Sequence, residues 1–196
     1  PDFIASLAMM EIARGAALLT TQGVPVFGLS NDFKFIGGGF IGKVSVSGII
    51  SIILTIFFAL LLKYTSFGRS LFAIGGNREA ATLSGIKTTR NYAITYVLCA
   101  ALAAFAGVLT ASWLATGQPT AGDGMELNAI AASVIGGASL SGGIGSMLGT
   151  FGGVFLLQII TNIFNLVGLA SFYQQIAKGI IIIAALLLNR AIDAKK

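Results

Sequence analysis

Three long stretches without a charged residue constrain the fold of this chain more than any other feature. They are Val44–Leu62, Asn91–Ala121 and Leu127–Ala177. Each is long enough for at least one helical crossing of a bilayer, which takes about 20 residues. Only 10% of the chain is charged and 56% is hydrophobic, whereas about a quarter of a soluble domain is charged. The sequence therefore predicts an integral membrane protein. Its apolar runs do not alternate strictly, which favours an all-α polytopic helical bundle over a barrel.

The placement of Lys and Arg predicts the orientation, because basic residues concentrate in cytoplasmic loops. Residues 63–90 contain a single acid, Glu79, and five basic residues: Lys63, Arg69, Arg78, Lys87 and Arg90. The C-terminal tail is also basic, with Arg190, Lys195 and Lys196. We expect the 63–90 loop and the C-terminus to be cytoplasmic. The segment Thr116–Glu126 has two acids and no basic residue, so we place it on the outer side.

Hydropathy and loop signals predict one transmembrane domain over residues 1–196, with the cytoplasmic loop 63–90 inside it. The predicted helices are Phe3–Thr20, Val44–Leu62, Asn91–Ala115, Ser146–Phe164 and Phe172–Asn189, and the stretch from Thr20 to Lys43 is predicted to be an outer loop. An even number of crossings must lie between Leu127 and Ala170. The first of these, Leu127–Ala138, is too short to span at about 1.5 Å per residue, so we expect a broken, tilted or re-entrant helix.

The cytoplasmic loop contains the signals of a short capped helix. Asn77 is a good N-cap, Glu79 suits the positive end of the helix dipole, and Gly85 ends the helix. Such a helix of about two turns is too short to be stable alone in water, so we expect it to dock on another protein. A solvated connector that merely obeys the charge rule is the alternative. The candidate contact residues, which include a flexible glycine pair, are Gly75, Gly76, Asn77, Arg78, Glu79, Ala80, Ala81 and Gly85.

Glycine dominates the stretch Gly136–Ser146, and small residues then recur every four positions at Ser141, Gly145, Gly149 and Gly153. This pattern is typical of close helix packing in membranes. It also suits a hinge beside a translocation path, where broken helices line a cavity. The candidate packing or hinge residues are Gly136, Gly137, Gly142, Gly143, Gly145, Gly149 and Gly153.

The sequence contains no complete nucleotide-binding motif and no catalytic group of residues. Gly37–Val44 has the spacing of a phosphate loop, but Val44 replaces the Ser or Thr that binds Mg²⁺, and no strand precedes it. With no His in the chain and its acids mainly in loops, we predict no catalytic residues, no metal site and no cofactor of its own. We also expect no nucleic-acid partner. If ATP drives this protein, another chain must bind it.

Polar side chains within the apolar runs are candidates for a solute path. They are Asn162, Asn165, Gln174, Gln175 and Lys178, although hydrogen bonds between helices explain the amides equally well, and Lys178 can snorkel to the interface. Glu11 and Arg14 are three residues apart on one helix face, where they can neutralise each other. Glu11 is also the one candidate acid for an ion-coupled secondary transporter or channel, the alternative function class.

The cytoplasmic helix carries a family resemblance. Glu79–Gly85 reads E-A-A-T-L-S-G, which resembles the E-A-A-x-x-x-G signature of permease subunits of bacterial ABC importers. The I-x-L-P part of that signature is absent. Four longer segments, in order and at matching spacing, resemble the ribose-type branch of sugar permeases: Ala73–Ile86, Gly117–Ala132, Ile135–Ser146 and Asn165–Lys178.

The resemblance implies a function that composition does not show. It implies a permease subunit in the bacterial inner membrane that moves ribose or a related monosaccharide into the cytoplasm by alternating access. The implied partners are a cytoplasmic ABC ATPase carrying ATP and Mg²⁺, a second permease subunit, identical or similar, and an extracytoplasmic sugar-binding protein. The Asn77–Gly85 helix would pass on the closure of the ATPase dimer. In family members further helices precede the matched segment, so the resemblance implies the C-terminal part of a longer permease.

Overall fold

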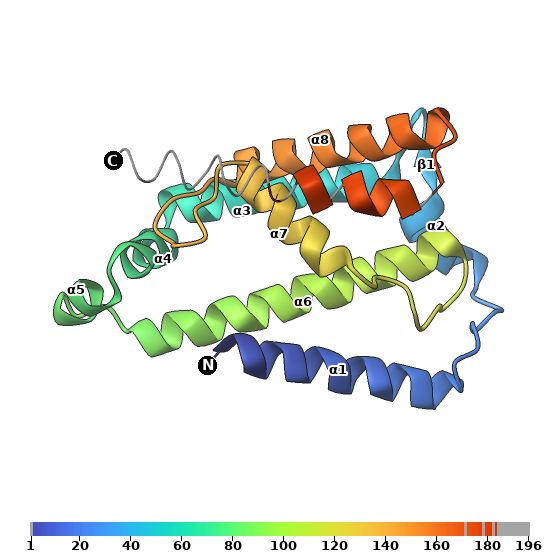
Figure 1. Ribbon diagram of the computed structural model, residues 1–196. Helices are drawn as coiled ribbons and strands as arrows, with labels where there is room; N and C mark the ends of the chain where they lie inside the picture. Colours follow the sequence, from blue (N-terminus) through green and yellow to red (C-terminus); the bar gives the residue numbers. More distant parts are fainter. Residues whose placement is uncertain (1, 171, 178, 182, 184–196) are drawn as a thin grey trace. The chain divides into compact units, whose positions relative to one another are not determined.

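A computed structural model describes residues 2–170, 172–177, 179–181 and 183. The chain divides into two compact units, which are described separately below. The first contains Pro1–Ile53 and Tyr96–Asp123, and the second contains Leu54–Thr95 and Gly124–Lys196. Helices α3 (Val46–Tyr64) and α6 (Thr88–Leu114) each have residues in both units (Figure 1). The structure is predominantly helical, as the sequence predicts.

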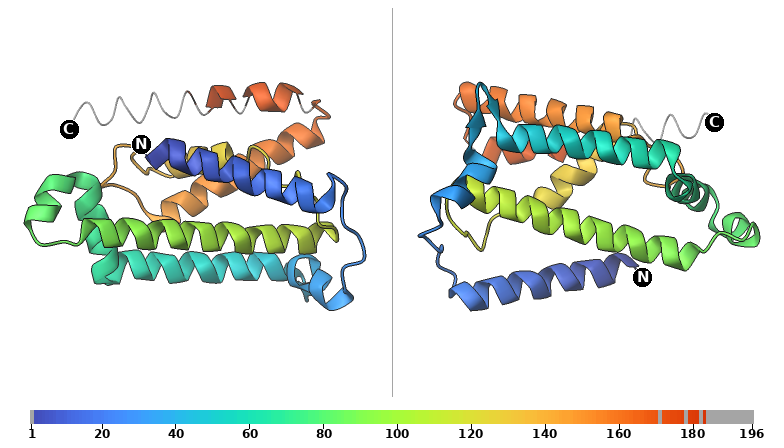
Figure 2. Two further views of the ribbon diagram at one scale, coloured as in Figure 1. Left: turned by 90° about the horizontal axis from the view of Figure 1, so that it is seen from below. Right: turned by 180° about the vertical axis from the view of Figure 1, so that it is seen from behind.

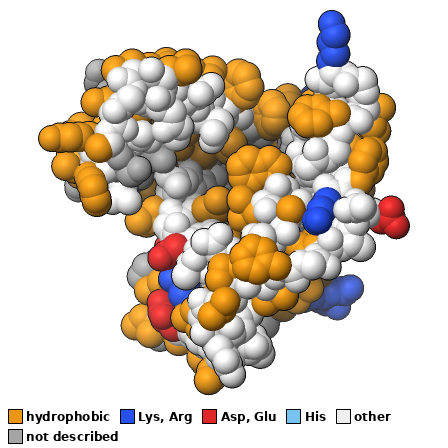
Figure 3. All heavy atoms as spheres, turned by 90° about the vertical axis from the view of Figure 1, so that its right-hand side faces the viewer, with side chains coloured by type: hydrophobic (Ala, Val, Ile, Leu, Met, Phe, Trp, Pro, Cys, Tyr) orange, Lys and Arg blue, Asp and Glu red, His pale blue; other side chains and the backbone are white. Residues whose placement is uncertain are grey.

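Among the residues that the structure describes, four helices are long and apolar enough to cross a membrane: α1 (Asp2–Thr21), α3, α6 and α8 (Met147–Leu166). The first and last residues of each helix lie within three residues of the ends of a predicted helix. Large apolar side chains on these helices are exposed, as at Leu19 (81%) and Val97 (68%), since lipid takes the place of a protein core around them. Figure 3 shows hydrophobic side chains spread over the face that it views. Of the predicted helix Phe172–Asn189, residues 172–177, 179–181 and 183 are described and are helical.

The first unit contains a short helix and a hairpin where the sequence predicts only a loop. Helix α2 (Asn31–Gly38) begins because the Ser30 hydroxyl accepts a hydrogen bond from the Phe33 amide at 3.3 Å. Strand β1 (Phe40–Ile41) then pairs antiparallel with β2 (Val44–Ser45) around Gly42, whose φ of +65° suits glycine. The phosphate-loop spacing of residues 37–44 is thus the end of a helix followed by a hairpin.

Ser112 fastens α2 to α6. Its hydroxyl accepts a hydrogen bond from the Gly37 amide at 2.7 Å and donates one to the Phe33 carbonyl. A Cβ at Gly37 would lie 2.8 Å from the Trp113 nitrogen, so only glycine lets the backbones approach this closely. The two views of Figure 2 place α2 beside the C-terminal end of α6. Ser112 is 1% exposed, and these two hydrogen bonds satisfy its buried hydroxyl group.

The second unit contains α4 (Ser66–Gly76) and α5 (Arg78–Leu83), which contact each other (Figure 1). The prediction of a single short helix in residues 63–90 is incomplete, and the prediction of a flexible pair at Gly75 and Gly76 is wrong. Thr65 caps α4 by accepting a hydrogen bond from the Gly68 amide at 3.3 Å, and α4 continues through both glycines. Only Asn77, with an extended backbone, separates α4 from α5.

Helix α7 (Met125–Ile135) packs along α8 in the same unit (Figure 1). Its 11 residues are too few to span a membrane, as predicted. The two backbones approach so closely that only glycine fits between them. A Cβ at Gly136 would overlap the Gly149 carbonyl, and one at Gly153 would overlap the Ala132 carbonyl. Glycine at these positions therefore brings α7 and α8 into direct main-chain contact.

Candidate functional site

Helix α5 is the short capped helix that the sequence indicates. The Asn77 side chain accepts a hydrogen bond from the Ala80 amide at 3.0 Å, and Glu79 lies in the first turn. The helix ends at Leu83, and Gly85 follows with a φ of +82°, a conformation that favours glycine. Both ends are therefore defined by local sequence.

The outer surface of α5 is largely free in the described structure. Ala81 is 4% exposed and packs inward, whereas Arg78, Glu79, Ala80 and Thr82 are exposed. Leu83 is 84% exposed. The helix thus presents one acid and one base beside an apolar side chain.

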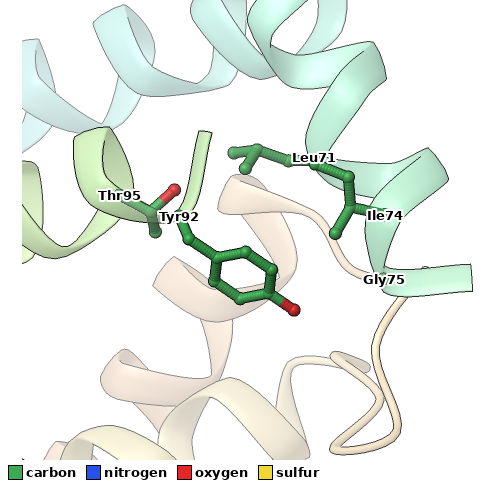
Figure 4. Close-up of a pocket in the computed structure, with 5 residues that line it drawn as sticks. All are labelled: Leu71, Ile74, Gly75, Tyr92 and Thr95. Carbon is green, nitrogen blue, oxygen red and sulfur yellow. The ribbon is translucent and has the colours of Figure 1, made fainter. Parts of the chain in front are cut away.

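The first residue of α5 contacts α6. The Arg78 guanidinium lies 5.0 Å from the centre of the Tyr92 ring, within the range of a cation–π interaction. Figure 4 shows Tyr92 and Thr95 facing Leu71, Ile74 and Gly75 across a small pocket of about 150 Å³. The position of α5 is therefore set from two sides, by α4 and by the start of α6.

Residues of the predicted docking group and of the predicted glycine-rich group meet in space. A Cβ at Gly75 would overlap the Gly143 nitrogen, and one at Gly142 would lie 2.6 Å from the Gly75 carbonyl oxygen. The loop between α7 and α8 therefore rests on the last turn of α4. Sequence reasoning treated these two groups as separate, because nothing in their spacing pairs them.

The other glycines of the glycine-rich group differ in their surroundings. Gly136, Gly149 and Gly153 lie in the α7–α8 contact described above. A Cβ at Gly145 would lie 3.3 Å from the Ala138 Cβ, which is a tight contact, whereas Gly137 has a φ of +88° and open space around it. Packing accounts for the first three, and a hinge in this loop stays a prediction.

Two of the candidate solute-path residues bond to each other. The Gln174 side-chain nitrogen donates to the Asn165 side-chain oxygen and to the Leu169 carbonyl, each at 2.9 Å. Gln174 is 9% exposed. This arrangement ties the end of α8 to the following helical residues. Asn162 and Gln175 are exposed, and Lys178 lies outside the described residues.

The predicted pairing of Glu11 with Arg14 is wrong. Arg14 instead makes an ion pair with Asp123, with 3.0 Å between the Arg14 Nη1 and Asp123 Oδ1 atoms. Glu11 is exposed on α1. The three-residue spacing allowed the pair, but the loop after α6 supplies the acid that Arg14 contacts.

Comparison with known proteins finds relatives that are named as permease proteins. The chain is 45% identical over 190 residues to the ribose import permease protein of Bacillus subtilis (strain 168), covering 96% of this chain and 59% of that protein. It is 42% identical to a probable ABC transporter permease protein of Escherichia coli K12, covering 96% of this chain and 57% of that protein. The L-arabinose transport system permease protein of the same strain is 38% identical, with 95% and 57% covered.

The chain spans about six-tenths of the length of these relatives. No solved structure matches it significantly. The family described as the permease component of the branched-chain amino acid transport system matches residues 2–186, almost the whole chain. This multi-pass membrane chain, whose near relatives include ribose import permeases, therefore belongs to that family of transport-system permease components.

Proposed function

We propose that this chain is part of the permease subunit of an ATP-binding-cassette importer, with α5 as the helix that couples it to a separate ATPase. The observation that carries the proposal is the geometry of α5. Asn77 caps the helix, Ala81 is buried, and Tyr92 contacts its first residue. Glu79 and Leu83 remain exposed. A six-residue helix with an exposed leucine gains most by docking into a groove of a partner. ATP and Mg²⁺ would bind that partner.

A monosaccharide is the substrate class that we propose, with ribose or a related sugar first. The relatives named for a substrate transport ribose or L-arabinose, although the family description mentions branched-chain amino acids. Identity of 38–45% over nearly the whole chain favours the sugar group. Competition against labelled ribose uptake by unlabelled arabinose and leucine tests the choice. Competition by leucine alone would reassign the substrate.

We further propose an inner-membrane location with the 63–90 segment and the C-terminus in the cytoplasm. In this orientation α5 faces the ATPase, and the loop before α7 faces an extracytoplasmic sugar-binding protein. A second permease subunit would cover apolar surface that lipid otherwise covers. Alternating access between outward-open and inward-open states would then move the sugar.

Charge reversal at Glu79 tests the coupling role. In proteoliposomes that contain permease, ATPase and binding protein, we expect Glu79→Lys to separate ATP hydrolysis from ribose uptake while the permease still inserts. Lys87→Glu is the control, since Lys87 is also an exposed charged residue of the 63–90 segment but lies outside α5. Normal uptake by Glu79→Lys would remove the role that we assign to this residue.

A further inference from the structure

The end of α4 and the loop between α7 and α8 meet backbone to backbone. Besides the Gly75 contacts with Gly142 and Gly143, a Cβ at Gly143 would lie 2.9 Å from the Gly76 Cα. Gly142 and Gly143 also have φ values of +94° and +74°, which L-residues rarely adopt. The contact thus needs glycine for two independent reasons, space and conformation.

This contact lies one residue from the helix that we propose as the ATPase dock. Gly75 is in the last turn of α4, Asn77 caps both α4 and α5, and no flexible linker separates the two helices. The Asn77 amide still donates to the Ala73 carbonyl at 3.1 Å while its side chain caps α5. Only Asn77 therefore lies between a displaced α5 and the last turn of α4, which contains Gly75.

On its other side the contact leads to a cavity. Loop residues Ser139 and Leu140, with Ile130 and Ser133 of α7, line an open cavity of about 380 Å³. The same loop continues into α8, and α7 is fastened to α8 where Gly136 meets Gly149. Main-chain contacts have no side-chain rotamers to absorb a shift, so movement is passed on across them.

We propose that the contact of Gly75 with Gly142 and Gly143 is the joint through which the coupling helix moves the α7–α8 pair and its cavity. This inference rests on the proposed function. These glycines are positioning residues and need not touch the sugar. An enlarged side chain at the joint should separate the two elements while the exposed face of α5 remains intact.

Two helical glycines provide a matched test in the reconstituted transporter, Gly75 of α4 and Gly107 of α6. A Cβ at Gly75 would overlap Gly143, whereas a Cβ at Gly107 meets no heavy atom within 4 Å. We expect Gly75→Ala to keep ATPase binding and ATP hydrolysis but to lose at least about tenfold in ribose uptake, since overpacked contacts shift backbones. Gly107→Ala should transport normally. Equal ribose uptake by the two variants would contradict the proposal that this contact transmits movement.

Hydrogen–deuterium exchange on the unmodified transporter tests the joint without relying on a variant that folds. Trapping the ATPase with Mg-ATP and vanadate should change exchange in residues 73–85 and, in step, in residues 136–146. A change in 73–85 with none in 136–146 would refute the joint while supporting the proposed function. If the ATPase does not bind and hydrogen–deuterium exchange in residues 73–85 does not change, the joint and the proposed function are both contradicted.

Discussion

The Arg78 guanidinium lies 5.0 Å from the centre of the Tyr92 ring, so the first residue of α5 contacts the N-terminal part of α6. Asn77 fixes the start of α5 by capping, and Arg78 fixes its direction by this contact. A helix of six residues cannot hold itself in water. Its orientation before a partner arrives therefore depends on neighbours such as Tyr92.

The ring of Tyr92 should matter more than its hydroxyl. We expect Tyr92→Leu to lower ribose uptake severalfold at normal expression, because a cation–π contact at an exposed site contributes about 0.5–1 kcal/mol and orients α5. Tyr92→Phe keeps the ring and should transport almost normally. Uptake assays in proteoliposomes compare the two. A defect in Tyr92→Phe as large as that in Tyr92→Leu would assign the effect to the hydroxyl.

Two adjacent glycines of α8 should respond in opposite ways to alanine. A Cβ at Gly153 would overlap the Ala132 carbonyl, whereas Gly152 has open space. We expect Gly153→Ala to destabilise the protein by about 1–3 kcal/mol through overpacking, and Gly152→Ala to leave stability unchanged or slightly higher. Thermal unfolding in detergent measures both. Similar melting temperatures would mean that α7 and α8 are not in main-chain contact.

Removal of the Ser112 hydroxyl should loosen α2. Both of its hydrogen bonds are to backbone groups of α2, so Ser112→Ala should cost about 1–3 kcal/mol by leaving buried groups unpaired. Thr110→Val is a suitable control, because the Thr110 hydroxyl bonds only the Ala106 carbonyl of its own helix at 2.8 Å. Limited proteolysis between residues 22 and 45 should be faster in Ser112→Ala alone. Unchanged cleavage would mean that α2 is held by other contacts.

Gln174 should affect stability before it affects the affinity for sugar. Its amide nitrogen is engaged by Asn165 and Leu169, so Gln174→Leu should lower the melting temperature. The exposed neighbour Gln175 is the control, and Gln175→Leu should leave the melting temperature unchanged. If Gln174→Leu instead raises the KM for ribose at an unchanged melting temperature, Gln174 contacts the substrate.

The spans of this protein could be predicted well because hydropathy and length act locally. The predicted helix Val44–Leu62 became α3 at Val46–Tyr64, and α5 followed from the cap at Asn77 and the stop at Gly85. These signals depend on residues that are close together in the sequence. The same is true of α7, whose shortness follows from the glycine run after Ile135.

Other features could not be predicted because they depend on contacts over long sequence distances. The composition of residues 21–43 reads as a loop, and α2 is held by Ser112, 75 residues from Gly37. Arg14 has a suitable acid three residues away, yet it pairs with Asp123. The contact of Gly75 with Gly142 could not be predicted from the sequence around either residue. Gly75 reads as part of a glycine pair before the cap at Asn77, and Gly142 reads as part of the glycine-rich stretch Gly136–Ser146. The Ser30 and Asp32 capping signals for α2 were visible, and they are the sign that could have corrected the loop prediction.

The exposure of Leu83 has a consequence for assembly. Its side chain is 84% exposed, and full burial of a leucine side chain contributes about 1.5–3 kcal/mol. If an ATPase docks on α5 as we propose, covering this one side chain would contribute up to that amount to the affinity of the complex.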